Sequence, residues 1–200
     1  MPRTVAVPRS IATARGLLND LATDSFNRAD AATLGNADSG QAWTLDNGAF
    51  AIVSNTARKT GVPESIADLS VGQADVDITL TEILPAGDNG DAGILFRFVD
   101  LSNYWRWQIR RSTAVNYDGN LTRRVAGVNT NMGSVGVTPG STVVLRVVAL
   151  GSLITVYSGG VQRVQVIDTA LVTATRHGIY DSNDEGDRAT FDDLTILKTT

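Results

Sequence analysis

GILFRFVDLSNYWRWQIRR, residues 93–111, is the most informative segment of the chain. Two apolar-rich runs, 94–99 and 104–109, flank a polar break at 100–103, where Asp, Ser and Asn favour a tight turn because their side chains bond nearby backbone groups. Apolar and polar residues alternate in the second run, which is the period-two pattern of a strand with one buried and one wet face. The stretch therefore predicts a β-hairpin.

The alternation also assigns the two faces of this hairpin. Large aromatic side chains are expected to face a core, because they bury more apolar area than other residues. These residues are Phe96, Phe98, Trp105 and Trp107. The opposite face is predicted to carry the polar side chains and one tyrosine, namely Arg97, Tyr104, Arg106, Gln108 and Arg110.

Composition narrows the class of protein. The chain has 200 residues, a net charge of -4 and no cysteine. We expect no nucleic-acid partner, because binding to phosphate backbones usually needs a concentrated basic face. No apolar run reaches transmembrane length, so membrane insertion is not expected. Residues 1–16 lack the apolar core of a signal peptide, which favours synthesis and use without export.

Strand and turn signals recur along the rest of the chain. Alternating or apolar runs at 74–82, 142–150, 153–157, 161–167, 177–180 and 189–197 predict strands. Asn47-Gly48 predicts a type I′ hairpin turn, and residues 54–72 are interpreted as a polar loop. Many short strands with regular turns predict an all-β protein, an antiparallel two-sheet jelly-roll sandwich.

The N-terminal segment 1–23 differs from the remainder. Ile11, Ala14, Leu17, Leu18 and Leu21 follow helical spacing, although Gly16 weakens that interpretation. A short amphipathic helix needs a surface to dock on. We therefore divide the chain into an N-terminal arm or helix at 1–23 and a sandwich domain at 24–200.

The order of several motifs resembles the concanavalin A-like, laminin G-like jelly-roll superfamily. The motifs are Asp-Ser-Phe-Asn-Arg at 24–28, Leu-Gly at 34–35, Trp43, Gly-Ile-Leu-Phe-Arg at 93–97, Asn-Tyr-Trp at 103–105, Leu-Arg-Val at 145–147, Val-Tyr-Ser-Gly-Gly at 156–160, His-Gly-Ile-Tyr at 177–180 and Phe-Asp-Asp-Leu-Thr-Ile at 191–196. The resemblance covers the sandwich domain and is more specific for fold than for function.

Phe-Asn-Arg openings are similar to those of minor tail proteins of bacteriophages of high-GC Gram-positive hosts, and of secreted bacterial glycan-binding proteins. The resemblance implies a non-enzymatic virion component, a minor tail or capsid-surface decoration protein assembled in the host cytoplasm. Residues 1–23 would attach it to other virion proteins in an oligomeric assembly. The alternatives are an extracellular carbohydrate-binding module or glycan hydrolase of bacteria, and a cement protein without ligand.

A catalytic role has two candidate signals. Some members of the superfamily hydrolyse glycans with carboxylates that alternate along one strand, because alternation places acid and nucleophile on one face. Asp75 and Asp77 alternate here, but the Glu-x-Asp-x-x-Glu pattern is absent. His177 has no accompanying Gly-x-Ser-x-Gly nucleophile motif. Because neither signal is accompanied by its full motif, the sequence favours a non-enzymatic protein.

A structural calcium ion is the one cofactor that the sequence suggests. Residues 181–187 place oxygen-bearing side chains at alternate positions, with a glycine at the sharp turn and a carboxylate further on. The ligands would be Asp181, Asn183, Glu185 and Asp192. A solvated acidic hairpin is the alternative, and Asp88, Asn89 and Asp91 form a second, weaker candidate.

The polar face of the 93–111 hairpin is the candidate ligand surface. Planar rings stack on the C–H faces of sugars, and polar groups bond their hydroxyls. Arg97, Tyr104, Arg106, Gln108 and Arg110 are therefore predicted to bind glycan or a protein partner. The competing interpretation is a sheet face covered by another segment or subunit, with arginine stems packed against it.

Overall fold

The computed structural model describes residues 19–61, 64–84, 91–111, 117–138, 140–182 and 189–199. These residues form antiparallel strands, and no helix among them could span a membrane. The strands are β1 (Asp20–Asp24), β2 (Thr44–Asn47), β3 (Phe50–Val53), β4 (Thr56–Lys59), β5 (Ser65–Ser70), β6 (Val76–Ile83), β7 (Asp91–Asp100), β8 (Asn103–Arg111), β9 (Tyr117–Val125), β10 (Val128–Val137), β11 (Thr142–Leu150), β12 (Leu153–Ser158), β13 (Val161–Ile167), β14 (Arg176–Asp181) and β15 (Thr190–Lys198).

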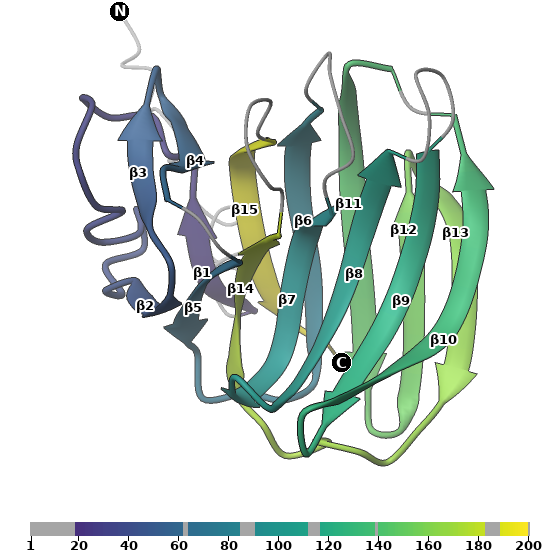
Figure 1. Ribbon diagram of the computed structural model, residues 1–200. Helices are drawn as coiled ribbons and strands as arrows, with labels where there is room; N and C mark the ends of the chain where they lie inside the picture. The colour runs from purple at the N-terminus through teal and green to yellow at the C-terminus, as the bar shows by residue number, and fades with distance from the viewer. Residues whose placement is uncertain are drawn as a thin grey trace, which may run out of the picture.

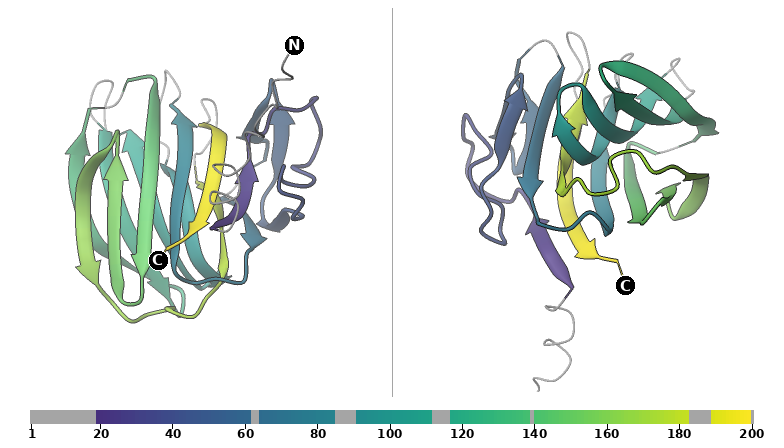
Figure 2. Two further views of the ribbon diagram at one scale, coloured as in Figure 1. Left: turned by 180° about the vertical axis from the view of Figure 1, so that it is seen from behind. Right: turned by 90° about the horizontal axis from the view of Figure 1, so that it is seen from below.

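Two sheets stack face to face (Figures 1 and 2). The eight-stranded sheet has the order β13-β12-β11-β6-β15-β4-β3, with β1 also paired to β15. The seven-stranded sheet has the order β10-β9-β8-β7-β14-β5-β2. Neighbours far apart in sequence, such as β7 and β14, are typical of a jelly roll rather than a meander. The predicted all-β antiparallel sandwich is confirmed.

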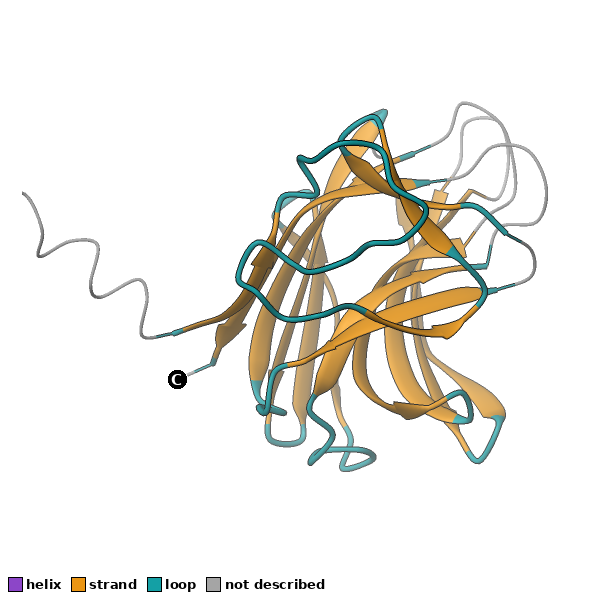
Figure 3. Ribbon diagram, turned by 90° about the vertical axis from the view of Figure 1, so that its left-hand side faces the viewer, coloured by secondary structure: helices purple, strands orange, loops and turns teal. Residues whose placement is uncertain are grey.

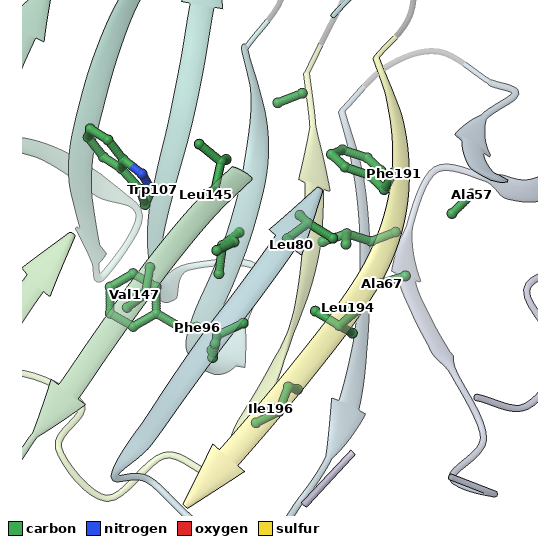
Figure 4. Packing of buried hydrophobic residues seen from close by; sticks show 14 of the residues in the cluster. Ala57, Ala67, Leu80, Phe96, Trp107, Leu145, Val147, Phe191, Leu194 and Ile196 are labelled. Carbon is green, nitrogen blue, oxygen red and sulfur yellow. The ribbon is translucent and has the colours of Figure 1, made fainter. Parts of the chain in front are cut away.

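One large apolar core lies between the sheets (Figure 4). Trp105 and Trp107 on β8 are fully buried, as the alternation predicts, and Phe96 stacks on Trp105 with 5.9 Å between ring centroids. Each indole N–H also donates a hydrogen bond to a backbone carbonyl, Trp107 to Tyr157 at 2.9 Å and Trp105 to Ala170 at 3.2 Å. Buried indoles need such partners, because an unpaired N–H in the core is costly.

The hairpin predicted at 93–111 is present as β7 and β8, with a β-bulge that the sequence did not indicate. Pairing is regular up to Phe96 and resumes at Asp100. Arg97 within the irregular segment has a φ of 48°, in the left-handed region. The bulge interrupts the alternation, so Phe98 joins a second, small cluster on the outer face of the seven-stranded sheet.

Two local predictions in the first third of the chain are wrong. Asn47-Gly48 does not close a hairpin, because β2 pairs with β5 in one sheet and β3 pairs with β4 in the other. The segment 54–72 is not a loop, since it contains β4 and β5. The hairpin turn lies instead at Ser54-Asn55, where both residues have positive φ, 52° and 61°.

The start of the sandwich precedes the predicted domain boundary. β1 pairs with β15, so Asp20–Asp24 belongs to the eight-stranded sheet, although the sequence assigned residues 20–23 to the arm and only Asp24 to the sandwich. The remainder of the predicted arm, residues 1–18, lies outside the described residues. After β1, a long connection crosses the flank of the sandwich to reach β2 (Figure 3).

Candidate functional site

The outer face of the seven-stranded sheet, which lies away from the core, holds most of the polar side chains that the sequence predicts for a ligand surface. The alternation of β8 places Tyr104, Arg106, Gln108 and Arg110 there, opposite the core-facing tryptophans. β9 runs beside β8 and adds the residues paired with them. These additions are Arg124 opposite Tyr104, Thr122 opposite Arg106, Asn120 opposite Gln108 and Asp118 opposite Arg110.

Arg106 is the centre of a buried floor on this face. It donates hydrogen bonds to the hydroxyls of Tyr180 at 2.7 Å and Tyr104 at 3.3 Å, and its guanidinium lies 4.5 Å from the Tyr180 ring centroid. Tyr180 donates in turn to Glu64 at 2.7 Å. Burial raises the pKa of both tyrosines, so both hydroxyls stay protonated. The floor is therefore a fixed set of hydrogen-bonding groups.

A second arginine covers the end of the floor nearest β5. Arg176 lies 4.8 Å above the Phe98 ring centroid and bonds Asp68 at 2.8 and 2.6 Å and Asp46 at 2.7 Å. Burial, together with a hydrogen bond to Asp46, raises the pKa of Asp68 to about 8. Arginine heads thus shield aromatic rings that the sheet leaves uncovered by another layer of strands.

The rim of the face, on β9 and β10, is accessible and lined by amides and hydroxyls. Ser134 donates to the side-chain oxygen of Asn120 at 2.6 Å, and Asn131 donates to Ser134 at 2.6 Å. Asn131 and Ser134 are exposed, and Asn120 is half-buried. Arg110 on β8 is also exposed. We call Arg110, Asn120, Arg124, Asn131 and Ser134 the polar rim.

Several buried polar atoms of this face have no hydrogen-bond partner within the described part of the chain. Two are donors, the Nε atoms of Arg106 and Arg124, and two are acceptors, Oε1 of Gln108 and Oδ1 of Asp91. An unpaired buried polar atom costs about 1–3 kcal/mol, so such atoms mark places where water or ligand groups would be favourable. Hydroxyl groups, which both donate and accept, match this mixture.

Of the predicted site residues, Arg97 is misplaced. The bulge turns it away from the outer face, and its side chain is fully buried. It donates to the carbonyl of Gly151 at 2.7 Å and to Asp75 at 3.2 Å. Tyr104, Arg106 and Gln108 do lie on the outer face, but within its buried floor rather than in open solvent. Arg110 alone among the five is exposed.

The sequence did not identify the rim residues of β9 and β10. The signal that could have found the β9 set is the alternation of Asp118, Asn120, Thr122 and Arg124 with Gly119, Leu121 and Arg123. β10 carries no comparable pattern, since its residues are largely exposed. Tyr180 and Glu64 reach the site from β14 and from the residue before β5, which only the folded topology reveals.

Asp75 and Asp77, the carboxylates considered for catalysis, form ion pairs away from the outer face of the seven-stranded sheet. Asp77 forms a two-pronged ion pair with Arg146, at 2.7 and 2.5 Å, on the eight-stranded sheet. Asp75 accepts from Arg97 and from the backbone N–H of Gly151 at 2.8 Å. Both side chains therefore have structural partners.

His177 is a fully buried residue of β14. Its Nδ1 accepts from the backbone N–H of Arg97 at 3.2 Å, and its Nε2 donates to the carbonyl of Gln73 at 2.8 Å. Burial lowers the pKa of His177 to about 4, so the imidazole is neutral at pH 7. The ring bridges the β7 bulge to the segment before β6.

The predicted calcium ligands are divided between the two sheets. Asp181 ends β14, where its buried carboxylate lies 4.0 Å from Nζ of Lys59. Asp192 lies on β15 in the eight-stranded sheet. Asn183, Glu185, Asp88 and Asn89 fall outside the described residues, and the residues that are described contain no cluster suited to a metal ion. Calcium therefore stays a prediction.

A separate apolar hollow of about 300 Å³ opens at the flank, between the loop at 32–35 and β2, β3 and β5. Trp43 and Leu45 line it together with Phe50 and Ala67. The indole N–H of Trp43 donates a 2.7 Å hydrogen bond to the carboxylate of Asp24. The same carboxylate also binds Arg28 at 2.7 and 3.0 Å. The Asp-Ser-Phe-Asn-Arg motif thus anchors the flanking loop.

Comparison with known proteins gives likeness of structure without likeness of sequence. No protein-family model and no curated protein sequence matches the chain. The carbohydrate-binding module CBM66 from Bacillus subtilis is similar in structure, with a TM-score of 0.64 and 16% identity over 78% of this chain and 95% of that module. At this identity the likeness shows the fold alone.

Two further solved structures extend the comparison. The GH43 protein BlXynB from Bacillus licheniformis has a TM-score of 0.69 and 14% identity, and the match covers 98% of this chain but 41% of that protein. The CBM2 module of the evolved Dit of Lactobacillus casei BL23 phage J-1 has a TM-score of 0.58 and 9% identity over 91% of this chain and 97% of that module. This chain thus matches nearly the whole of two modules and 41% of a longer protein.

Proposed function

We propose that this protein is a non-enzymatic glycan-binding sandwich, and that the glycan lies across the outer face of β8, β9 and β10. The observation that carries the proposal is the polar rim. Its amides, hydroxyls and guanidinium groups project from three adjacent strands, and their hydrogen bonds to one another hold several of them in place. Binding then costs little side-chain entropy.

The buried floor supports the same function. Arg106, Tyr104 and Tyr180 position one another, and unpaired donors and acceptors remain at Arg106, Gln108 and Asp91. These atoms have almost no accessible surface, so the floor holds the neighbouring strands in position, and the polar rim makes the contacts with the hydroxyls of a polyol. The likeness to carbohydrate-binding modules is consistent with this choice.

A hydrolase is the less favoured alternative. Glycan hydrolysis needs two carboxyl groups about 5–10 Å apart across the scissile bond. On the outer face, Glu64 accepts a hydrogen bond from Tyr180 and pairs with Arg106 at 3.9 Å, and Asp91 lies 3.8 Å from Arg110. These contacts give both carboxyl groups structural roles, which supports a binding protein.

We further propose that the sandwich is displayed on a bacteriophage virion, as a minor tail or capsid-surface protein. The motif resemblance at residues 24–28 and the structural likeness to a module of a phage Dit support this setting. The other setting, a carbohydrate-binding module of an extracellular bacterial enzyme system, is supported by the likeness to CBM66 and BlXynB.

A glycan array followed by isothermal titration tests the binding function. We expect the protein to bind at least one oligosaccharide and to lose about tenfold in affinity on Asn120→Ala, the scale of one or two lost hydrogen bonds. Thr155→Ala, on the opposite sheet, is the control and should bind as the wild type does. Absence of binding to any glycan, or equal affinity of the Asn120→Ala variant, would refute the proposal.

A further inference from the structure

The four arginines of the outer face differ in their counter-charges. Arg106 has Glu64 at 3.9 Å, Arg110 has Asp91 at 3.8 Å, and Arg176 has Asp46 at 2.7 Å. Arg124 has no carboxylate within 4.0 Å among the residues that the structure describes. Arg124 is therefore a cation of this face that has no charged partner among the described residues.

The positive charge of Arg124 is also not compensated by more distant groups of its own strand. Its guanidinium lies 5.9 Å from the Tyr104 ring centroid, and its Nε is buried without a hydrogen-bond partner in the described parts of the chain. Asp118, the acidic residue of the same strand, is six positions away, about 20 Å along an extended chain. Opposite charges across that distance are largely screened in water at ordinary salt.

The arrangement gives the outer face a charge gradient along β8 and β9. At one end, Asp91 of β7, Arg110 of β8 and Asp118 of β9 lie directly opposite one another, so that end carries acids beside its arginine. The other end presents Arg124 beside Asn129 of β10, which is exposed and uncharged. A planar guanidinium held against an aromatic ring is well placed to bind an oxyanion, because its N–H groups match two oxygen atoms.

We propose that the glycan bound by this face is acidic, and that a carboxylate, phosphate or sulfate of the glycan binds Arg124. This inference rests on the proposed glycan-binding function and names its ligand class. The amides and hydroxyls of the polar rim bond hydroxyl groups of the glycan, while Arg124 supplies the charge that selects an acidic sugar over its neutral parent. Arg124 thus acts as the specificity-determining residue of the site.

An array of matched pairs tests the inference. Each uronic-acid, sulfated or phosphorylated oligosaccharide is spotted beside its neutral parent, and affinities for the best pair are measured in solution. We expect the acidic member to bind at least about tenfold more tightly, the scale of a charge-assisted hydrogen bond. Arg124→Gln should abolish that difference, Arg124→Lys should keep part of it, and Arg58→Gln, a change on β4 in the other sheet, should leave it intact.

Three results would contradict the inference of an acidic ligand. Equal binding of acidic and neutral members would overturn the acidic-ligand inference and leave the glycan-binding function standing. Absence of binding to every glycan would overturn both. A salt titration of the wild type removes any dependence on variant folding: affinity for the acidic member should fall from 50 to 500 mM salt, as screening requires. Affinity for the neutral parent should not change, and a salt-independent preference would contradict an ionic contact.

Discussion

The two faces of β8 bury side chains to similar extents, but the surroundings of those side chains are apolar on one face and polar on the other. On the inward face, Trp105 and Trp107 are fully buried in an apolar core, and each has one hydrogen bond. On the outward face, Tyr104 and Arg106 are also buried, but among hydroxyls, guanidinium groups and carboxylates. Burial alone therefore does not distinguish the apolar core from a candidate site, whereas the chemistry of the neighbouring side chains does.

The inward face should carry the larger share of stability. We expect Trp107→Ala to lower the free energy of unfolding by about 3–5 kcal/mol, because it removes a large buried ring and leaves a cavity. Denaturant unfolding measures this effect. Arg110→Ala, on the same strand but exposed on the opposite face, is the matched control. A Trp107→Ala loss below about 1 kcal/mol would mean that the indole does not belong to a packed core.

Buried His177 should make stability depend on pH. Its folded-state pKa of about 4 lies below the unfolded value of 6.5, so the unfolded state binds the proton first and stability falls as the pH drops from 6.5 to 4. The full loss is about 3 kcal/mol. The raised pKa of Asp68 acts in the opposite direction, since its contribution is lost as pH rises toward 8.

The variant His177→Asn isolates this contribution from that of Asp68. The stability advantage of the wild type over His177→Asn should shrink between pH 6.5 and pH 4, as followed by urea unfolding at each pH. An imidazole that titrates near pH 6.5 in the NMR spectrum of the folded protein would contradict the assignment.

The buried floor of the outer face should contribute less than the core. We expect Arg106→Ala to cost about 1.5–3 kcal/mol, because it removes charge-assisted hydrogen bonds to two buried tyrosines. Thermal or denaturant unfolding checks the value, with Arg58→Ala as the control. If Arg106→Ala is neutral, the floor is not held together by this arginine.

The rim should contribute least to stability. The Arg110–Asp91 contact, at 3.8 Å, involves an arginine side chain that is 55% exposed, and such pairs contribute about 0–1 kcal/mol. Arg110→Ala should therefore shift the unfolding free energy by about 0.5 kcal/mol or less. A much larger loss would show that the rim belongs to the structural layer and not to a ligand surface.

The inward face of β8 could be predicted from the sequence because a period-two pattern needs only neighbouring residues. The burial of Trp105 and Trp107 followed from alternation alone. The bulge at Arg97 did not, because a positive φ at arginine leaves no mark in the pattern. Asn47-Gly48 suited a hairpin turn, but the pairing of β2 with β5 overrode that local preference.

The outward face could be predicted only in part. Tyr104, Arg106, Gln108 and Arg110 were placed on the correct side, yet their burial depends on Tyr180 and Glu64, which come from distant segments. Sequence alternation reports the direction of a side chain and not what lies beside it. For the same reason, the place of Arg124 on this face, with no carboxylate beside it in the described part of the chain, became visible only once β9 was paired with β8.

The claim that a glycan lies across β8, β9 and β10 is tested most directly by mapping the contact. A ¹⁵N NMR titration with the best array ligand should shift the side-chain amides of Asn120 and Asn131 and the Nε–H of Arg124, while the indole N–H signals of Trp43 and Trp107 stay in place. Shifts centred on Trp43, or on Arg146 and Tyr157 of the eight-stranded sheet, would place the ligand elsewhere and contradict the claim.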